Sequence, residues 1–133
     1  MNDLGTLPNG FTSNATAINN AGEVVGTADT LITSPFYTIA SHAFLYSHSV
    51  MTDLGTLPGD LGSGATAINQ FGHVVGFSLS PNYFTRAFVY IHGAMTNLGT
   101  LPGGGNSVAT AINKHGWIVG YADTSNSSSR AFL

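Results

Sequence analysis

Apolar and polar positions alternate along this chain in short runs, and the same runs return three times. In the first copy, Ala15-Thr16-Ala17-Ile18-Asn19 is followed by Gly22 and then by Val24-Val25-Gly26. Alternation with a period of two, bounded by Asn, Gly and Pro, predicts β-strands separated by tight turns. No window of ten or more residues shows the spacing of an amphipathic helix, so we expect essentially no helix.

The spacing of the runs defines three repeat units within a single domain. The Ala-Phe pair recurs with both spacings equal to 44 residues, at Ala43, Ala87 and Ala131. The Ile-Asn pair returns after 50 and then 44 residues, so the first unit carries an insertion, between Gly26 and Ala43. An insertion that leaves its flanks intact is expected in a surface loop. We place the units at about residues 1–50, 51–94 and 95–133.

The repeat contains four short strand-like segments, exemplified by Asn14–Ile18, Glu23–Ala28, His42–Ser47 and Met51–Leu57. A four-stranded antiparallel meander of this length matches one blade of a β-propeller. The small residues of the first segment suit the crowded innermost strand of a blade, where we expect its threonine to bond to backbone. Asn19, followed three residues later by Gly22, is expected to cap a tight turn.

Closure of the ring follows from the order of the segments. Residues 1–7 repeat the fourth segment, and the last unit stops in its third segment at Ala131–Leu133. We therefore expect residues 1–7 to be a strand that completes the last blade, and, since propellers have about four to eight blades, two chains to close a six-bladed ring as a homodimer. A β-trefoil, which also has three four-stranded units, is the main alternative, and a triangular β-prism is the third.

Composition narrows the classes of function. Hydrophobic residues make up 43% of the chain but charged residues only 7%, against a usual quarter or so. A net charge of −3, with three cationic side chains, argues against nucleic-acid binding, because such binding neutralises several phosphates together. No apolar run approaches the roughly 18 residues of a membrane span, so we expect no membrane insertion.

The same composition bears on location. A surface rich in hydroxyl and amide groups is typical of secreted all-β repeat proteins, so we expect an extracellular or cell-surface protein. The absence of cysteine excludes disulfides and thiolate metal sites. The first residues already belong to a repeat and show no signal-peptide pattern; we interpret the chain as an excised segment or a processed form.

Two recurring motifs carry a family resemblance. His42-Ala43-Phe44 returns with arginine in place of histidine in the other two units, and Asp53-Leu54-Gly55-Thr56-Leu57-Pro58-Gly59 precedes the second copy of the Ala-x-Ala-Ile-Asn run. In these motifs, which cover essentially the whole chain, the sequence resembles the HAF-repeat family. The resemblance implies a bacterial extracellular or surface protein, with no established activity and no catalytic residues. Asn97, which replaces the aspartate of the other units, departs from the pattern.

Two sets of residues are candidates for ligand binding. One set holds a cationic or potentially cationic group at the same place in each unit, as a ring of donors for sugar hydroxyls or anions: His42, Arg86 and Arg130. The other is Trp117 with Tyr121, which can stack on a sugar ring, although packing between blades is the simpler explanation of both. The histidines lack zinc-ligand spacing, and no serine lies in a Gly-x-Ser-x-Gly elbow. We expect no catalytic site, metal or cofactor.

The sequence therefore predicts a non-enzymatic extracellular repeat module. Its first predicted role is binding of carbohydrate or surface glycan, where several weak equivalent sites gain by multivalency. The alternative is a purely structural scaffold or assembly repeat without a small-molecule ligand. A hydrolase is the least expected of the three, because the six acidic residues are scattered and not paired.

Overall fold

The computed structural model describes residues 1–30 and 40–133, and this part of the chain contains strands and turns but no helix. Most of the predicted insertion lies in residues 31–39, outside the described residues. No helix long and apolar enough to span a membrane occurs in the described ranges. The strands are β1 (Ser13–Ile18), β2 (Val24–Thr30), β3 (Ala40–Ser47), β4 (Val50–Gly55), β5 (Gly62–Ile68), β6 (Val74–Leu79), β7 (Thr85–Ile91), β8 (Ala94–Gly99), β9 (Ser107–Ile112), β10 (Ile118–Asp123) and β11 (Ser129–Phe132).

The strands form three antiparallel sheets, and the fourth strand of each of the first two sheets, β4 and β8, extends into the next repeat unit. The first sheet has the order β1-β2-β3-β4, the second β5-β6-β7-β8, and the third β9-β10-β11. The predicted all-β class, the antiparallel meanders and the absence of helix are thus confirmed for the described residues. The fourth segment ends earlier than predicted, at Gly55 rather than Leu57, because Gly55 turns the chain with a φ of 72°.

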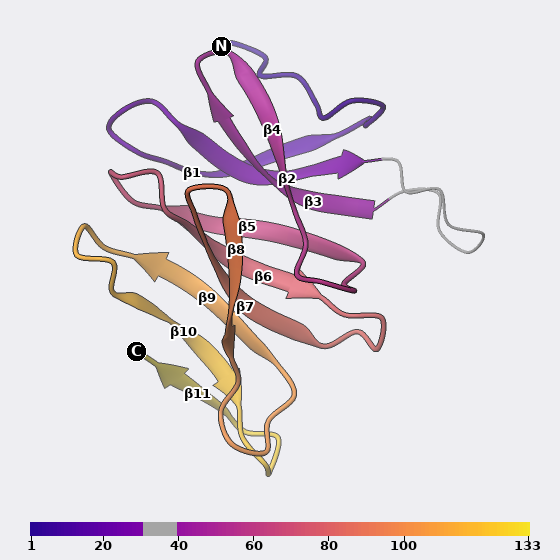
Figure 1. Cartoon of the computed structure of the whole chain (residues 1–133), viewed down its shortest axis with the longest axis vertical. Coiled ribbons are helices and arrows are strands. Elements are labelled where there is room, and N and C mark those ends of the chain that lie inside the picture. Colours follow the sequence, from indigo (N-terminus) through magenta and orange to yellow (C-terminus); the bar gives the residue numbers. More distant parts are fainter. Residues whose placement is uncertain (31–39) are drawn as a thin grey trace.

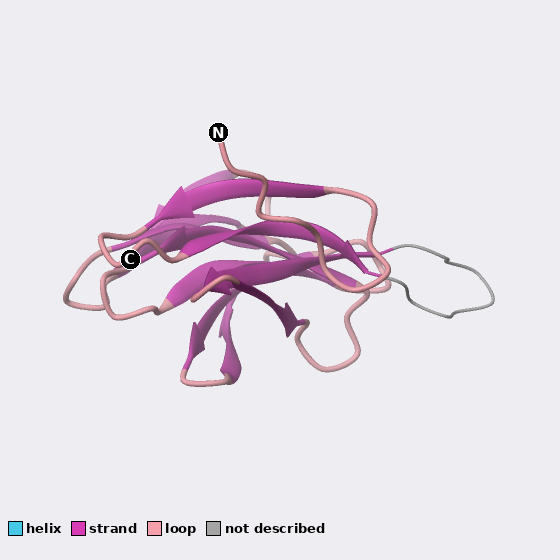
Figure 2. Ribbon diagram, turned by 90° about the horizontal axis from the view of Figure 1, so that it is seen from above, coloured by secondary structure: helices cyan, strands magenta, loops and turns pink. Residues whose placement is uncertain are grey.

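Consecutive sheets lie face to face. The first strand of each following sheet packs on the first three strands of the sheet before it: β5 contacts β1, β2 and β3, and β9 contacts β5, β6 and β7. Figure 1 shows the three sheets one above another, with the two termini towards opposite ends of the stack. Seen from above, in Figure 2, the layers overlap closely. None of the sheets closes into a ring.

Residues 1–7 do not behave as predicted. They form no strand and pair with no part of β11, so within the single chain they do not complete the last blade, and completion of the blade of a second chain stays a prediction. Instead, Leu7 is buried against Ala28 and Phe44 of the first sheet. The reason is geometric: β11 lies in the third sheet, and the first sheet lies at the other end of the stack (Figure 1).

A β-bulge explains the most regular part of the repeat. In the first sheet Ala15 pairs with Gly26 and Ala17 with Val25, so Thr16 is the extra, unpaired residue. The bulge pushes the inner strand towards its neighbour. A Cβ on Gly26 would lie 1.9 Å from the carbonyl oxygen of Asn14. Only glycine fits opposite the bulge, and the same conflict recurs at Gly76 and Gly120.

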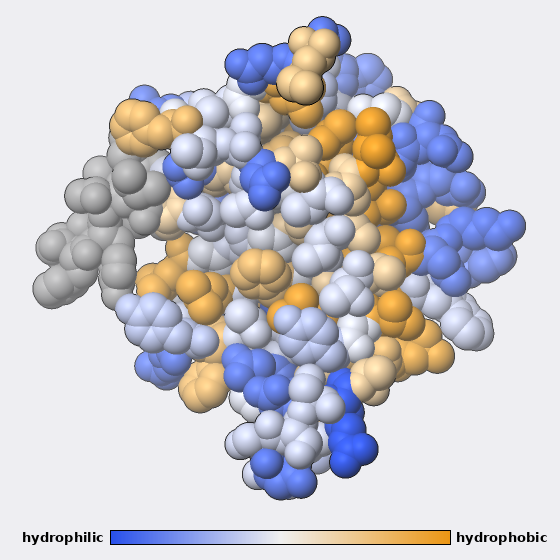
Figure 3. Space-filling view, turned by 180° about the vertical axis from the view of Figure 1, so that it is seen from behind, coloured by the Kyte–Doolittle hydropathy of each residue, from blue (hydrophilic) through white to orange (hydrophobic). Residues whose placement is uncertain are grey.

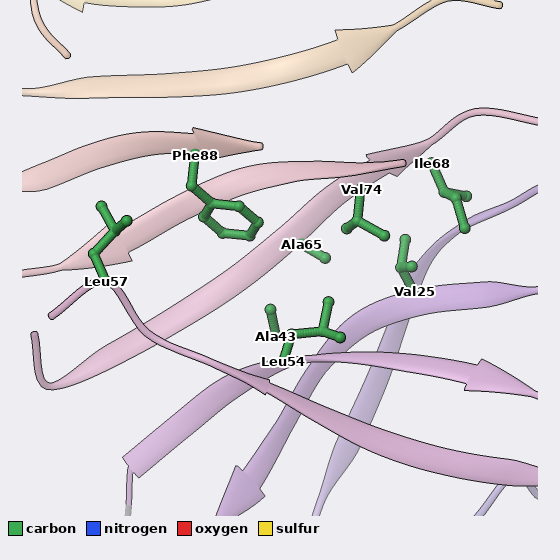
Figure 4. Close-up of a cluster of buried hydrophobic side chains, with 8 residues drawn as sticks. All are labelled: Val25, Ala43, Leu54, Leu57, Ala65, Ile68, Val74 and Phe88. Carbon is green, nitrogen blue, oxygen red and sulfur yellow. The ribbon is translucent and has the colours of Figure 1, made fainter. Parts of the chain in front are cut away.

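The core lies between the sheets. Its largest cluster lies between the first and second sheets (Figure 4), on the sides by which these two sheets face each other. Its members are Val25, Ala43, Leu54, Leu57, Ala65, Ile68, Val74 and Phe88. A second cluster joins the second and third sheets around Val75, Ala87 and Ala109. The small alanine side chains on the first strand of each sheet allow consecutive sheets to approach closely. The Phe88 side chain, on the third strand of the second sheet, fills the wider space away from the first strand.

Candidate functional site: the seams and the two end faces

The three recurring cationic positions have different surroundings. The His42 Nδ1 atom lies 2.9 and 3.0 Å from the two carboxylate oxygens of Asp53. Arg86 donates from its terminal NH2 group to Asp60, whose side chain is fully buried. Arg130 is exposed and has no ion pair among the described residues. Each of the three positions is thus engaged differently within the chain, and the ring of donors stays a prediction.

Trp117 and Tyr121 lie on one side of β10. Because successive side chains of a strand alternate, they share that side with Val119, and the three are 62%, 47% and 42% exposed. The residues equivalent to Val119 are Val25 and Val75, and both are completely buried under the next sheet. The aromatic pair therefore belongs to a sheet face that, in the other two units, is a packing surface.

The Asp53 carboxyl group has a lowered pKa. Partial burial alone would raise its pKa, but the hydrogen bonds from His42 and from the Gly55 N–H favour the ionised form, so that the pKa lies below its ordinary value of 3.8. Asp3 and Asn97, at the equivalent positions, accept the same hydrogen bond from the glycine two residues on. This shared role is a turn cap, and it explains why asparagine can replace aspartate.

The lowered pKa predicts a pH dependence of stability. A carboxyl group with a depressed pKa in the folded state stabilises the fold fully above its unfolded pKa, and this contribution is lost as the pH falls through the folded pKa. We expect the unfolding free energy of Asp53→Asn to fall less steeply than that of the wild type as the pH drops below about 4. The effect should stay below about 1 kcal/mol, because solvent screens a partly exposed pair. Urea unfolding between pH 2.5 and 7 tests this; an unchanged acid limb would contradict it.

No metal centre accompanies these residues. The described part of the chain contains no group of three or more His, Asp or Glu side chains that would hold a metal ion. The two histidines that do meet, His73 and His92, pack ring edge to face at 5.8 Å between centroids. Edge-to-face packing of two rings is favourable without a bound metal ion, so this contact does not indicate a metal site.

The bulged threonines link one sheet to the next, an interface that we call a seam. Thr16 Oγ1 donates to the carbonyl of Ala65 in the second sheet at 2.7 Å, and Thr66 Oγ1 to Ala109 in the third at 2.6 Å. Each hydroxyl also lies more than 3 Å from a carbonyl of its own sheet. A hydroxyl has one hydrogen, so the shorter bond across the seam takes it. Bonding to backbone was predicted; the bond to the next unit was not.

The turn asparagines make a second link. The Asn19 side-chain oxygen accepts the N–H groups of Ala21 and Glu23, as an Asx turn requires. Its Nδ2 is then free to donate across the seam to the carbonyl of Asn69 at 3.1 Å. In the second unit, Asn69 repeats the arrangement and donates to the carbonyl of Asn113 at 3.2 Å. The predicted turn cap is thus one of two roles of this asparagine, and the other is the hydrogen bond across the seam.

A third link uses buried serines that the sequence reasoning missed. Ser63 Oγ accepts the N–H of Ala43 at 2.8 Å and donates to the carbonyl of Gly55. Ser107 does the same at the other seam, with Ala87 and Gly99. The signal was present, since a serine stands two residues before the first alanine of the motif in every unit: Ser13, Ser63 and Ser107.

The two ends of the stack carry the same groups without partners from a neighbouring sheet. We call the side of the first sheet with Ser13, Ala15 and Ile18 the head face, and the side of the third sheet with Val119 and Ala131 the tail face. Ile18 is 67% exposed, whereas Ile68, its equivalent within a seam, is 9% exposed. Apolar side chains therefore remain at the surface, and Figure 3 shows apolar groups as a broken band between polar ones.

No known protein family, curated protein or solved structure matches this chain. The resemblance to the HAF-repeat family, and the extracellular location that it implies, therefore remain predictions.

Proposed function

We propose that the chain is a non-enzymatic, β-propeller-type repeat module that works as an assembly scaffold. The single observation that carries this proposal is that the same seam occurs twice within the chain, while its two halves stand uncovered at opposite ends. Stability in repeat proteins comes largely from interfaces between neighbouring units. A further unit on either end face would bury surface that is already shaped for it.

The apolar surface at the ends supports the same role. Val25 and Val75 are 0% exposed within the seams, against 42% for Val119 on the tail face. Ala43 and Ala87 are also completely buried, whereas Ala131 is exposed. Burial of a valine side chain is worth about 1.5–3 kcal/mol. A propeller commonly has about four to eight blades, so six units from two chains would complete a ring.

A charge on the tail face tests the scaffold role. We expect wild-type chain to self-associate and Val119→Lys to weaken association at least about tenfold, because an unpaired ammonium would have to leave water. The matched control is Val50→Lys, since Val50 is 59% exposed at a hairpin beside a formed seam. Light scattering reports mass, and circular dichroism verifies folding. Equal association of both variants and the wild type would contradict the proposal.

Glycan binding is the second candidate, and exposure of Trp117 and Tyr121 on one side of β10 favours it. The two roles compete, because a unit packed on the tail face would cover that side. A glycan array probed with the wild-type chain and with Trp117→Ala separates them. We expect no Trp117-dependent binding at millimolar sugar; such binding would assign this face to carbohydrate and count against the scaffold role.

A further inference from the structure

The hydrogen-bonding groups of the two end faces match one another. In each seam, three hydrogen bonds run from a donor of the earlier sheet to an acceptor of the later sheet. On the tail face the equivalent donors are the Thr110 hydroxyl, the Asn113 side-chain amide and the Ala131 N–H. Within the described residues the Thr110 hydroxyl has only a 3.3 Å contact to Val119 of its own sheet. The Asn113 side-chain oxygen accepts the N–H groups of its turn, and among the described residues its Nδ2 has no acceptor.

The head face offers the corresponding acceptors, which are the carbonyls of Ala15 and Asn19 and the hydroxyl oxygen of Ser13. Ser63 and Ser107, the equivalents of Ser13, are at most 4% exposed, whereas Ser13 is exposed. One chain thus carries a full set of donors at one end and a full set of acceptors at the other. The surface that would cover the tail face is therefore the head face of the same chain.

The N-terminal residues occupy the place of a missing strand. Ser13 donates to the carbonyl of Gly5 at 2.6 Å, as Ser63 does to Gly55 and Ser107 to Gly99. Gly55 and Gly99 belong to β4 and β8, the fourth strands of the preceding sheets. Residues 3–5 therefore lie where the fourth strand of a sheet before the first would lie, although that sheet is absent from the chain.

A cleft is found on each side of this arrangement. On the head side, a cleft of about 510 Å³ lies between residues 1–4 and the side chains of Ser13, Ala15 and Phe44. Beside the unpaired edge of β11, a cleft of about 200 Å³ lies between residues 98–101 and Ala122, Phe132 and Leu133. In the second and third sheets, the first strand, which is equivalent to β1, contacts the third strand of the sheet before it. In the first and second sheets, the residues equivalent to Phe132 and Leu133 pair with the fourth strand of their own sheet.

We propose that a second copy of this chain docks its head face on the tail face and supplies residues 2–5 as the fourth strand of the third sheet. This inference rests on the proposed scaffold function and adds the partner and the register. In the first sheet β3 and β4 pair as Ala43 with Gly55, Phe44 with Asp53 and Leu45 with Thr52. The same register pairs Ala131 with Gly5, Phe132 with Asp3 and Leu133 with Asn2 of the second copy.

This pairing covers the free edge of β11, which would otherwise be a template for uncontrolled strand addition. The interface is heterologous, since head meets tail. Heterologous interfaces produce a ring when the rotation closes and an open array when it does not. Two copies of a chain with three sheets close at six, a number within the range of propellers.

Cysteine cross-linking tests the register, because the chain has no cysteine of its own. Purified Asn2→Cys is mixed with Leu133→Cys and oxidised, and the control mixture is Asn2→Cys with Ser129→Cys, at the other end of β11. All three positions are exposed, so the variants should fold. We expect the first mixture to yield disulfide-linked heterodimer on a non-reducing gel at least tenfold more efficiently than the control.

The outcomes separate the two proposals. Chains that associate by light scattering but cross-link equally in both mixtures, or in neither, would overturn the strand pairing and leave the scaffold role standing. Chains that remain single at all concentrations would overturn both. Preferential cross-linking of Asn2→Cys to itself would also reject the pairing, because it requires head to meet head.

Discussion

Phe88→Ala is expected to lower the unfolding free energy by about 3–5 kcal/mol. The side chain is 0% exposed and belongs to the cluster that joins the first and second sheets. In Figure 4 its ring lies among Leu57, Ala65 and the neighbouring strands. Truncation would leave a cavity that the flanking sheets fill only in part. Since a domain of this size is stable by roughly 5–15 kcal/mol, the loss would be a large fraction of the total.

The matched control for this variant is Phe71→Ala. Phe71 lies in the turn before β6 and is 61% exposed, with one tilted ring contact to His73. We expect a change within about 0.5 kcal/mol there. Urea unfolding followed by circular dichroism measures both. If Phe88→Ala were no more destabilising than Phe71→Ala, the seam would not be a packed core.

Arg86→Ala is expected to destabilise the fold by a similar amount, about 3–5 kcal/mol, for an electrostatic reason. The Asp60 side chain is fully buried, and Arg86 is its ion-pair partner. Among the described residues, Asp60 Oδ2 and Arg86 Nε have no hydrogen-bond partner. Removal of the arginine would leave a buried carboxylate without a counter-charge, which costs far more than an exposed one.

Two further variants isolate this electrostatic effect. Arg130→Ala changes the equivalent, exposed arginine of the third unit and should alter stability by less than about 0.5 kcal/mol. The double variant Asp60→Leu with Arg86→Met replaces the pair by apolar side chains and should recover most of the loss. Denaturant midpoints give all three values. Equal losses for Arg86→Ala and Arg130→Ala would show that the buried pair is unimportant.

The repetitive part of the fold could be predicted from the sequence, because periodicity reports which residues share an environment. The three Ala-x-Ala-Ile-Asn runs predicted three inner strands, and Asn19 before Gly22 predicted a turn that the structure contains. The Val-Val-Gly run of the first two copies and the Ile-Val-Gly run of the third predicted a strand, but not the reason for the glycine. That reason lies in the bulge on the neighbouring strand.

The sequence pattern did not predict features that occur in only one unit, or features that depend on which strand or sheet lies beside a given residue. The pair of Asp60 and Arg86 joins positions 26 residues apart, and the other units have glycine at the place of Asp60. Residues 1–7 have the pattern of a strand, yet a strand also needs a ladder partner, and the single chain provides none. The seam bond of Thr16 shows the same limit, since a hydroxyl pattern does not name its acceptor.

The mass of the wild-type chain in solution tests most directly whether the head and tail faces cover one another. Sedimentation velocity over a range of micromolar concentrations measures it without a label. The account predicts a closed pair near twice the chain mass of 13.7 kDa. A single species at 13.7 kDa at every concentration would contradict it, and a mass that grows without limit would reject the ring.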